Sequence, residues 1–258
     1  MAYTINGGSF STWSMTALSC EGALDFPKRL GEYEYDWGDS YGTEGFVSTD
    51  DLFWDGREIK VKVFYKGSNL VSSIDTLLST LKGTNLTLVT TFGSHACRIM
   101  GIKTVSILKP NQQALLEISF WENAVPVSSA PAAVGGSGIL LAGRDFYVDF
   151  GMHTKSIGGY SDVPDFYQRN LTYGSAARIM SGVRKNRTVR IELNGRYTSL
   201  ATMISKVNSL RYLLMSSGLK SLVYRTVTKN TYFTDGAKVY ADPKTFSANL
   251  ILNLKIQE

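Results

Sequence analysis

Residues 57–65 read Arg-Glu-Ile-Lys-Val-Lys-Val-Phe-Tyr, and residues 187–193 read Arg-Thr-Val-Arg-Ile-Glu-Leu. In both stretches apolar and polar residues alternate, which predicts a β-strand with one buried face. Each stretch is followed by a predicted helix, over residues 70–82 and 198–215. Ile59 corresponds to Val189 and Leu70 to Leu200, an offset of 130 residues in both cases and about half of the chain. This offset predicts a tandem repeat of one structural plan.

The two predicted helices each carry an apolar stripe at helical spacing, which indicates a face packed against the core. The stripes consist of Leu70, Ile74, Leu77, Leu78 and Leu81 in the first helix and of Leu200, Met203, Ile204, Val207, Leu210 and Leu214 in the second.

Further strand patterns follow both helices. They lie at residues 86–92, 96–102 and 115–121 in the first half and at 219–227, 231–240 and 248–256 in the second. Residues 124–138 are uncharged and rich in small residues, which is typical of a linker. We therefore expect a mainly β fold with two related domains, 1–123 and 139–258. Each is expected to be a β-sandwich with one packed helix.

The composition fits such a fold. The chain has 258 residues with 24 Gly, 6 Pro and 12% aromatic residues, a profile of turn-rich β proteins. No apolar run approaches the roughly 18 residues that cross a bilayer. The first residues lack the basic start and apolar stretch of a secretory signal. We therefore expect no membrane association and synthesis in the cytoplasm.

Reactive clusters are not evident in the sequence. Cys20 and Cys97 are expected to be unpaired thiols. His95 and His153 lack metal-ligand spacing with the cysteines or with each other. No nucleophile, phosphate-loop or dinucleotide motif occurs. We expect no catalytic residues, no metal, no cofactor and no enzymatic activity.

Charge is unevenly divided along the chain. Residues 1–130 contain 10 Lys/Arg and 14 Asp/Glu, whereas the remaining residues contain 17 and 8. A basic half is compatible with nucleic-acid binding. It is equally compatible with an acidic half of one subunit that faces the basic half of a neighbour.

A long segment between predicted strands, residues 25–42, alternates aromatic and acidic residues. Its aromatic residues could stack on carbohydrate, anchor a protein interface or pack on the chain's own core. Its acidic residues could bind calcium or form a hydrolytic carboxylate pair, but a solvated or partner-facing segment is favoured. The aromatic residues are Tyr33, Tyr35, Trp37 and Tyr41, and the acidic residues are Glu32, Glu34, Asp36 and Asp39, with Glu44 just beyond the segment.

A basic run occupies the second half. It lacks interleaved aromatic residues, so a solvated strand face or a contact with an acidic neighbour is favoured over phosphate tracking. The run consists of Arg178, Arg184, Lys185, Arg187, Arg190 and Arg196.

Residues 25–123 carry four features in a fixed order: Pro27-x-Arg29-x-Gly31-x-Tyr33, then Gly56-Arg57-Glu58-Ile59-Lys60-Val61, then the 70–82 helix, then the 115–121 strand with its Glu122-Asn123 exit. In this order they resemble the N-terminal domain of the distal tail proteins of long-tailed bacteriophages, which share a core with tail-tube proteins. The second half departs from the pattern, because Pro164 is not followed by Arg-x-Gly-x-Tyr.

The resemblance implies a virion protein of the tail tip, made in the host cytoplasm. It implies a ring, hexameric or a pseudo-hexameric trimer, that joins the tail tube to the hub or receptor-binding apparatus and lets DNA pass without specific binding. A tail-tube or hub subunit and a carbohydrate-binding β-sandwich are the alternatives. The expected interface residues are Arg29, Tyr33, Tyr35, Trp37, Tyr41, Arg184, Lys185 and Arg187.

Overall fold

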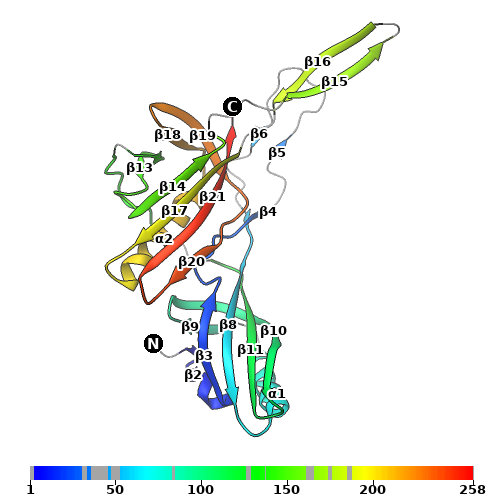
Figure 1. Ribbon diagram of the computed structural model, residues 1–258, viewed down its shortest axis with the longest axis vertical. Helices are drawn as coiled ribbons and strands as arrows, with labels where there is room; N and C mark the ends of the chain where they lie inside the picture. Colours follow the sequence, from blue (N-terminus) through cyan, green and yellow to red (C-terminus); the bar gives the residue numbers. More distant parts are fainter. Residues whose placement is uncertain are drawn as a thin grey trace. The chain divides into compact units, whose positions relative to one another are not determined.

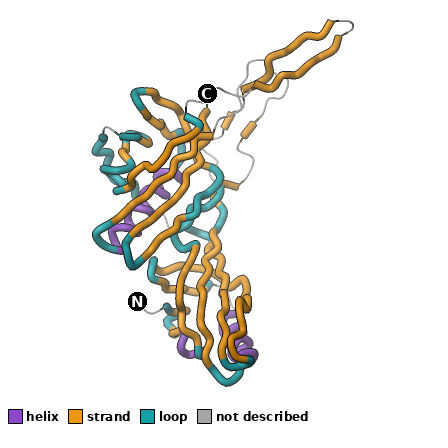
Figure 2. The backbone as a smooth tube through the Cα atoms, in the orientation of Figure 1, coloured by secondary structure: helices purple, strands orange, loops and turns teal. Residues whose placement is uncertain are grey.

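The computed structural model describes residues 3–257 except 31–33, 36–45, 48–52, 83–84, 126–128, 137, 161–165, 174–175 and 185–187. The chain forms two compact units (Figures 1 and 2). Unit 1 comprises Met1–Pro27, Asp55–Pro126 and Lys238–Pro243. Unit 2 comprises Lys28–Trp54, Val127–Ala237 and Lys244–Glu258. Both are mostly antiparallel β, which confirms the expected mainly β fold.

Unit 1 is built on one sheet with strand order β2-β1-β9-β10-β11-β8-β3. A short 3-10 helix, η1 (Phe10–Trp13), precedes β3, and helix α1 (Leu70–Leu81) lies between β8 and β9 in the chain. The strands are β1 (Thr4–Ile5), β2 (Gly8–Ser9), β3 (Met15–Glu21), β8 (Arg57–Lys66), β9 (Leu86–Thr90), β10 (Gly93–Lys109) and β11 (Gln113–Glu122); β20 (Val239–Asp242) lies in this unit's last segment.

Unit 2 contains a sheet with the order β13-β12-β18-β19-β21-β17-β14, and helix α2 (Leu200–Met215) follows β17. The strands are β12 (Leu140–Leu141), β13 (Arg144–Asp145), β14 (Met152–Gly158), β17 (Thr188–Arg196), β18 (Lys220–Tyr224), β19 (Val227–Phe233) and β21 (Ser247–Gln257). Three two-stranded ribbons complete it: β4 (Arg29–Leu30) with β7 (Phe53–Trp54), β5 (Glu34–Tyr35) with β6 (Phe46–Val47), and β15 (Phe166–Tyr173) with β16 (Ala176–Arg184).

The two sheets have the same strand order when β1, β2, β3, β8, β9, β10 and β11 are matched in turn with β12, β13, β14, β17, β18, β19 and β21. In both units the helix follows the equivalent strand, β8 or β17. A repeated plan is therefore visible in the topology. Each expected sandwich takes the form of one continuous hydrogen-bonded sheet.

The helices begin at matching capping residues. The Asn69 side chain accepts a hydrogen bond from the Ser72 N–H (3.1 Å), and the Ser199 side chain accepts one from the Thr202 N–H (3.1 Å). Each bond satisfies a backbone donor that the first helical turn leaves unpaired. Both apolar stripes face the core, with Leu77 and Val207 fully buried.

The compact units do not follow the single boundary expected near residues 124–138, because two segments lie in the other repeat's unit. In unit 2 the Arg29 N–H donates to the Thr234 carbonyl (2.8 Å), and the Trp54 Nε1–H donates to the Met215 carbonyl (3.2 Å). In unit 1 the Val239 N–H donates to Asp25 Oδ1 (2.8 Å). Periodicity identifies strands and helices, but it does not say against which body a long insertion packs.

The second half of the expected linker belongs to unit 2. The Arg144 Nε–H donates to the Pro131 carbonyl (2.7 Å). Buried Asp149 and Asp145 accept hydrogen bonds from the Val134 and Gly138 N–H groups (3.3 and 2.9 Å). Three side chains thus hold this part of the expected linker to unit 2.

Candidate interface and buried polar network

A buried ion pair joins two neighbouring strands of the unit 1 sheet, β8 and β11. The Arg57 Nε–H at the start of β8 donates to Glu122 Oε2 at the end of β11 (2.5 Å), and both side chains are almost fully buried. Arg57 Nη1–H also donates to the Asp25 carbonyl (3.3 Å), where the chain has left β3. These hydrogen bonds join the start of β8, the end of β11 and the chain beyond β3.

His95 completes this network. Its Nδ1 lies 3.4 Å from Arg57 Nη2 and 3.3 Å from Glu122 Oε1. Burial alone would raise the pKa of the Glu122 carboxyl, but the hydrogen bond from His95 and the charge of Arg57 bring this pKa below its ordinary value. Burial also lowers the pKa of the Arg57 guanidinium, and Glu122 offsets part of that effect. Glu122 is therefore held as a carboxylate inside the unit.

The network superficially matches a hydroxyl–imidazole–carboxylate triad, because Thr90 Oγ1 lies 3.2 Å from His95 Nε2. The Thr90 hydroxyl, however, donates its one proton to the Gly93 carbonyl (3.3 Å) and accepts from the Phe92 N–H (3.0 Å). The hydroxyl thus has three partners and is not directed at the imidazole alone, as the nucleophile of a triad would be. All three groups are also buried. The arrangement is structural.

Two pieces of the sequence motif in residues 25–123 meet in this network. The pieces are Gly56-Arg57 and Glu122-Asn123. Arg57 and Glu122 are 65 residues apart in the sequence and form a direct hydrogen bond. Gly56 has no room for a side chain, since a Cβ there would lie 2.5 Å from the Glu122 carbonyl oxygen. The glycine therefore permits the close approach that the ion pair needs. The motif residues are architectural in this chain.

The two cysteines are free, as expected from the sequence, and neither is activated. Burial raises the pKa of the Cys20 thiol to about 12 and that of the Cys97 thiol to about 11. Both remain protonated at neutral pH and are poor nucleophiles.

Among the described residues, no group of three His, Cys, Asp or Glu side chains could hold a metal ion. Likewise, none of the described helices is long and apolar enough to cross a membrane.

The expected interface residues fall into three groups. Arg29 is only 3% exposed, so its side chain is part of the interior rather than of an open surface. Tyr35 lies in β5 and Arg184 at the end of β16. Tyr33, Trp37, Tyr41, Lys185 and Arg187 lie outside the described residues.

The charge asymmetry between the sequence halves does not separate the compact units. Unit 1 contains 9 Lys/Arg and 8 Asp/Glu, and unit 2 contains 18 and 14. The asymmetry disappears because the acidic stretch Lys28–Trp54 belongs to unit 2. An acidic domain that faces a basic domain is therefore not the arrangement that this fold offers.

The clearest open surface in unit 1 is a strand edge that sequence analysis missed. The first part of β10, Gly93–Cys97, pairs with β9, and the rest, Arg98–Lys109, pairs with β11. In the described structure no strand pairs with the other side of Arg98–Lys109. Exposed apolar residues occur along this edge: Met100, Val105, Ile107 and Leu108.

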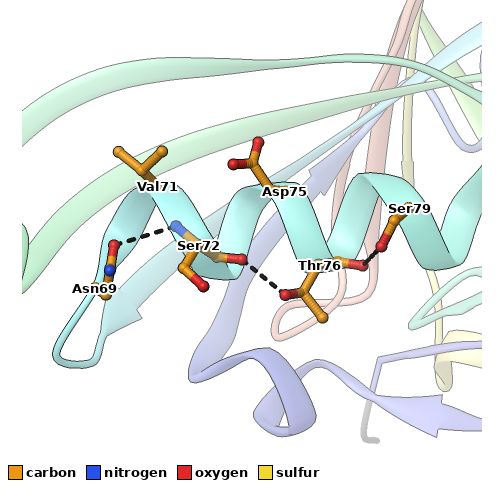
Figure 3. A pocket seen from close by; sticks show the side chains of 6 residues that line it. All are labelled: Asn69, Val71, Ser72, Asp75, Thr76 and Ser79. Carbon is orange, nitrogen blue, oxygen red and sulfur yellow. Dashed lines mark hydrogen bonds between the residues drawn. The ribbon is translucent and has the colours of Figure 1, made fainter.

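A shallow groove of about 450 Å³ follows the outer side of α1 (Figure 3). Two of its lining hydroxyls are used within the helix, since Thr76 Oγ1 donates to the Ser72 carbonyl and Ser79 Oγ to the Thr76 carbonyl. The remaining lining residues are Asn69, Val71, Ser72 and Asp75. Side chains occupied in this way offer little to a ligand.

No protein-family model matches the chain, and no curated protein matches it. Among solved structures, the chain is similar to the Dit protein (gp 19.1) of phage SPP1, whose description calls it a paradigm of the hub adsorption apparatus in phages that infect Gram-positive bacteria. The TM-score is 0.38 at 10% sequence identity, over 100% of this chain and 99% of that one.

Proposed function

We propose that this chain is a structural subunit of a bacteriophage tail tip, a distal tail protein that forms a ring between the tail tube and the hub or receptor-binding apparatus. The observation that carries the proposal is the repeated strand order, with a helix at the same place in both units. Two similar units in one chain suit a ring of three subunits with six similar positions, and a ring of six subunits is the other closed solution.

The buried network supports an architectural role for the tail-protein motif. Arg57, Glu122 and Gly56 lie in the interior of unit 1, where they hold strand ends together. Residues that stabilise the fold suit a structural protein, whose role depends on its shape and not on a reactive site. We propose no enzymatic activity and no cofactor.

In this role DNA passes through the ring without specific binding, and the partners are further copies of the chain, the tail tube and the hub proteins. The protein would then be part of the virion. A tail-tube or hub subunit of the same machine is the alternative, since it would use the same repeated unit.

The decisive experiment is a mass measurement by light scattering over a range of protein concentrations at low and high salt, with negative-stain microscopy of the same samples. We expect closed rings of three or six chains of 28.4 kDa. A monomer under every condition, with no ring in the images, would overturn the proposal. Binding to a glycan array by such a monomer, lost in Trp37→Ala, would instead favour a carbohydrate-binding module.

A further inference from the structure

The second half of β10, Arg98–Lys109, which we call the β10 edge, exposes four large apolar side chains. Three of them, Met100, Val105 and Leu108, lie at register shifts, where β10 has one residue more than β11. The fourth, Ile107, directly precedes Leu108. Each of the four is between 54% and 58% exposed. They form an apolar row along a stretch whose outer side no described strand covers.

Register shifts change what such an edge can bind. A regular edge strand presents evenly spaced N–H and C=O groups that recruit another strand, and bulges disrupt that spacing. The β10 edge is therefore a poor template for a shared sheet. A partner would instead contact its side chains.

The charge of the β10 edge has one sign. Residues 93–113 contain Arg98, Lys103 and Lys109 and no Asp or Glu. All three basic side chains are exposed, and the ion pairs that the structure describes in unit 1 use other basic residues. The surface that complements this edge is therefore apolar in part and negatively charged.

The interface of an anionic lipid bilayer has both properties. Apolar side chains bind at the boundary between headgroups and acyl chains, and Lys and Arg are attracted to anionic headgroups. Water at the headgroup level can hydrogen-bond the free N–H and C=O groups of the edge, which the hydrocarbon core could not do. A protein partner would need pockets that match the uneven spacing of the four apolar residues. Lipids rearrange around a protein, so a bilayer needs no such match.

We propose that the β10 edge binds the surface of an anionic lipid bilayer. The inference rests on the proposed ring, because a closed cyclic ring holds all its copies of this edge at one height, where they meet a plane together. One edge has three basic residues, fewer than the roughly four to eight of a typical lipid-binding cluster. A single chain should therefore bind weakly, and a ring should bind tightly through its several contacts.

This contact is compatible with the sequence features. The expectation of no membrane association rested on the lack of a spanning run and of a secretory signal. A strand that lies at the interface requires neither of them.

Vesicle flotation tests the proposal on the full chain at concentrations that form rings. The vesicles are phosphatidylcholine alone and equal parts of phosphatidylcholine and phosphatidylglycerol. We expect the rings to float with the anionic vesicles and to remain behind with the neutral ones. High salt should weaken the binding, because it screens the basic residues.

A charge placed in the apolar row should weaken this binding. We expect Val105→Glu to reduce the bound fraction on anionic vesicles about tenfold or more, since several copies lose the contact together. The matched control is Leu18→Glu, because Leu18 is 56% exposed and lies at a register shift of β3, the opposite edge of the same sheet. The control should bind like the wild type. Circular dichroism and light scattering should show that both variants fold and form rings.

A fluorescent label tests the same contact without an added charge. Val105→Cys that carries an environment-sensitive dye should shift its emission to the blue on anionic vesicles. Leu18→Cys with the same dye should not, and the labelled wild type corrects for Cys20 and Cys97. An equal shift at both positions would overturn the assignment to the β10 edge.

The outcomes separate this inference from the proposed function. Wild-type rings that ignore anionic vesicles, or that bind them equally well in Val105→Glu, would overturn the lipid contact and leave the ring in place. In the first case an acidic protein surface would be the better occupant. A chain that stays monomeric would contradict the ring, whereas weak anionic binding by that monomer, lost in Val105→Glu, would still support the β10 edge.

Discussion

Gly22 and Gly159 occupy the same position in the two repeats, where the chain leaves β3 and β14. Both have a positive φ, +81° and +75°. A Cβ on Gly22 would lie 2.1 Å from the Glu58 carbonyl oxygen, and one on Gly159 would lie 2.2 Å from the Thr188 carbonyl oxygen. At each exit, therefore, the backbone passes against the neighbouring strand so closely that only glycine fits.

We expect Gly22→Ala and Gly159→Ala to destabilise the protein strongly, by more than the roughly 1 kcal/mol of a left-handed conformation alone. The additional cost arises because the clash is with backbone, which cannot rotate away. Denaturant unfolding measures the change. The matched control is Gly7→Ala, since Gly7 has φ +80° and nothing within 4 Å of a Cβ. Equal losses in all three variants would show that the close approach is unimportant.

Glu122→Ala should cost about 3–5 kcal/mol of unfolding free energy, because it leaves Arg57 charged and buried without its partner. The control is Lys62→Ala, which breaks a contact of similar length with Glu21 (2.6 Å) between exposed side chains. That change should cost about 0–1 kcal/mol. Replacing both buried partners, as in Arg57→Met with Glu122→Leu, should recover much of the loss. Similar midpoints for Glu122→Ala and Lys62→Ala would contradict the role of burial.

Leu77→Ala should cost about 2–5 kcal/mol, and Val207→Ala somewhat less because fewer methyl groups are removed. Both residues are fully buried on the inner faces of their helices. Val71→Ala, on the outer face of α1, should change stability little. Unchanged unfolding midpoints for the two buried positions would mean that the helices do not pack as described.

Lys220 should make stability depend on pH above neutrality. Its Nζ donates to the Ser216, Ser217 and Gly218 carbonyls beyond α2 (2.9, 2.6 and 2.7 Å), and burial lowers its pKa to about 8 from an ordinary 10.5. Between these two values the unfolded chain holds more protons at this site than the folded chain, so the unfolding free energy gained from Lys220 rises with pH.

The measurement is the unfolding free energy of the wild type minus that of Lys220→Met, taken from pH 7 to pH 10. The difference should be flat below pH 8 and rise above it. Subtraction is needed because burial raises the pKa of Cys20 and Cys97, and those groups act in the opposite direction in both proteins. A difference that stays flat to pH 10 would refute the lowered pKa.

Local patterns predicted β8, β17 and both helices well, whereas the strands expected at 219–227 and 231–240 are displaced, since β18 ends at Tyr224 and β19 spans Val227–Phe233. The alternation at residues 57–65 and 187–193 corresponds to β8 and β17. The predicted first helix ends one residue later than α1, and the predicted second helix begins two residues earlier than α2. Each of these elements buries one face, so its apolar residues recur at the spacing of a strand or a helix and can be recognised in the sequence. The 96–102 strand was predicted too short, since β10 continues to Lys109. Its bulges at Met100, Val105 and Leu108 break the alternation on which the prediction relied.

The parts that depend on distant contacts could not be predicted. Arg57 and Glu122 are each ordinary charged residues in a strand, and only the folded sheet brings their side chains together. The Lys28–Trp54 segment had the composition of an exposed loop, but Arg29 and Trp54 hydrogen-bond in unit 2. Of the expected interface residues, Arg29 is buried, and nothing in its neighbouring sequence signals this.

The exchanged segments bear on how such a gene can evolve. A duplication ordinarily leaves two copies that can be lost, shuffled or replaced one at a time. Here a recombination event within residues 124–138 would separate β4 and β7 from the unit they complete and would separate Lys238–Pro243 from Asp25. Neither copy would be inherited whole. A chain divided at residues 124–138 would therefore leave neither compact unit complete.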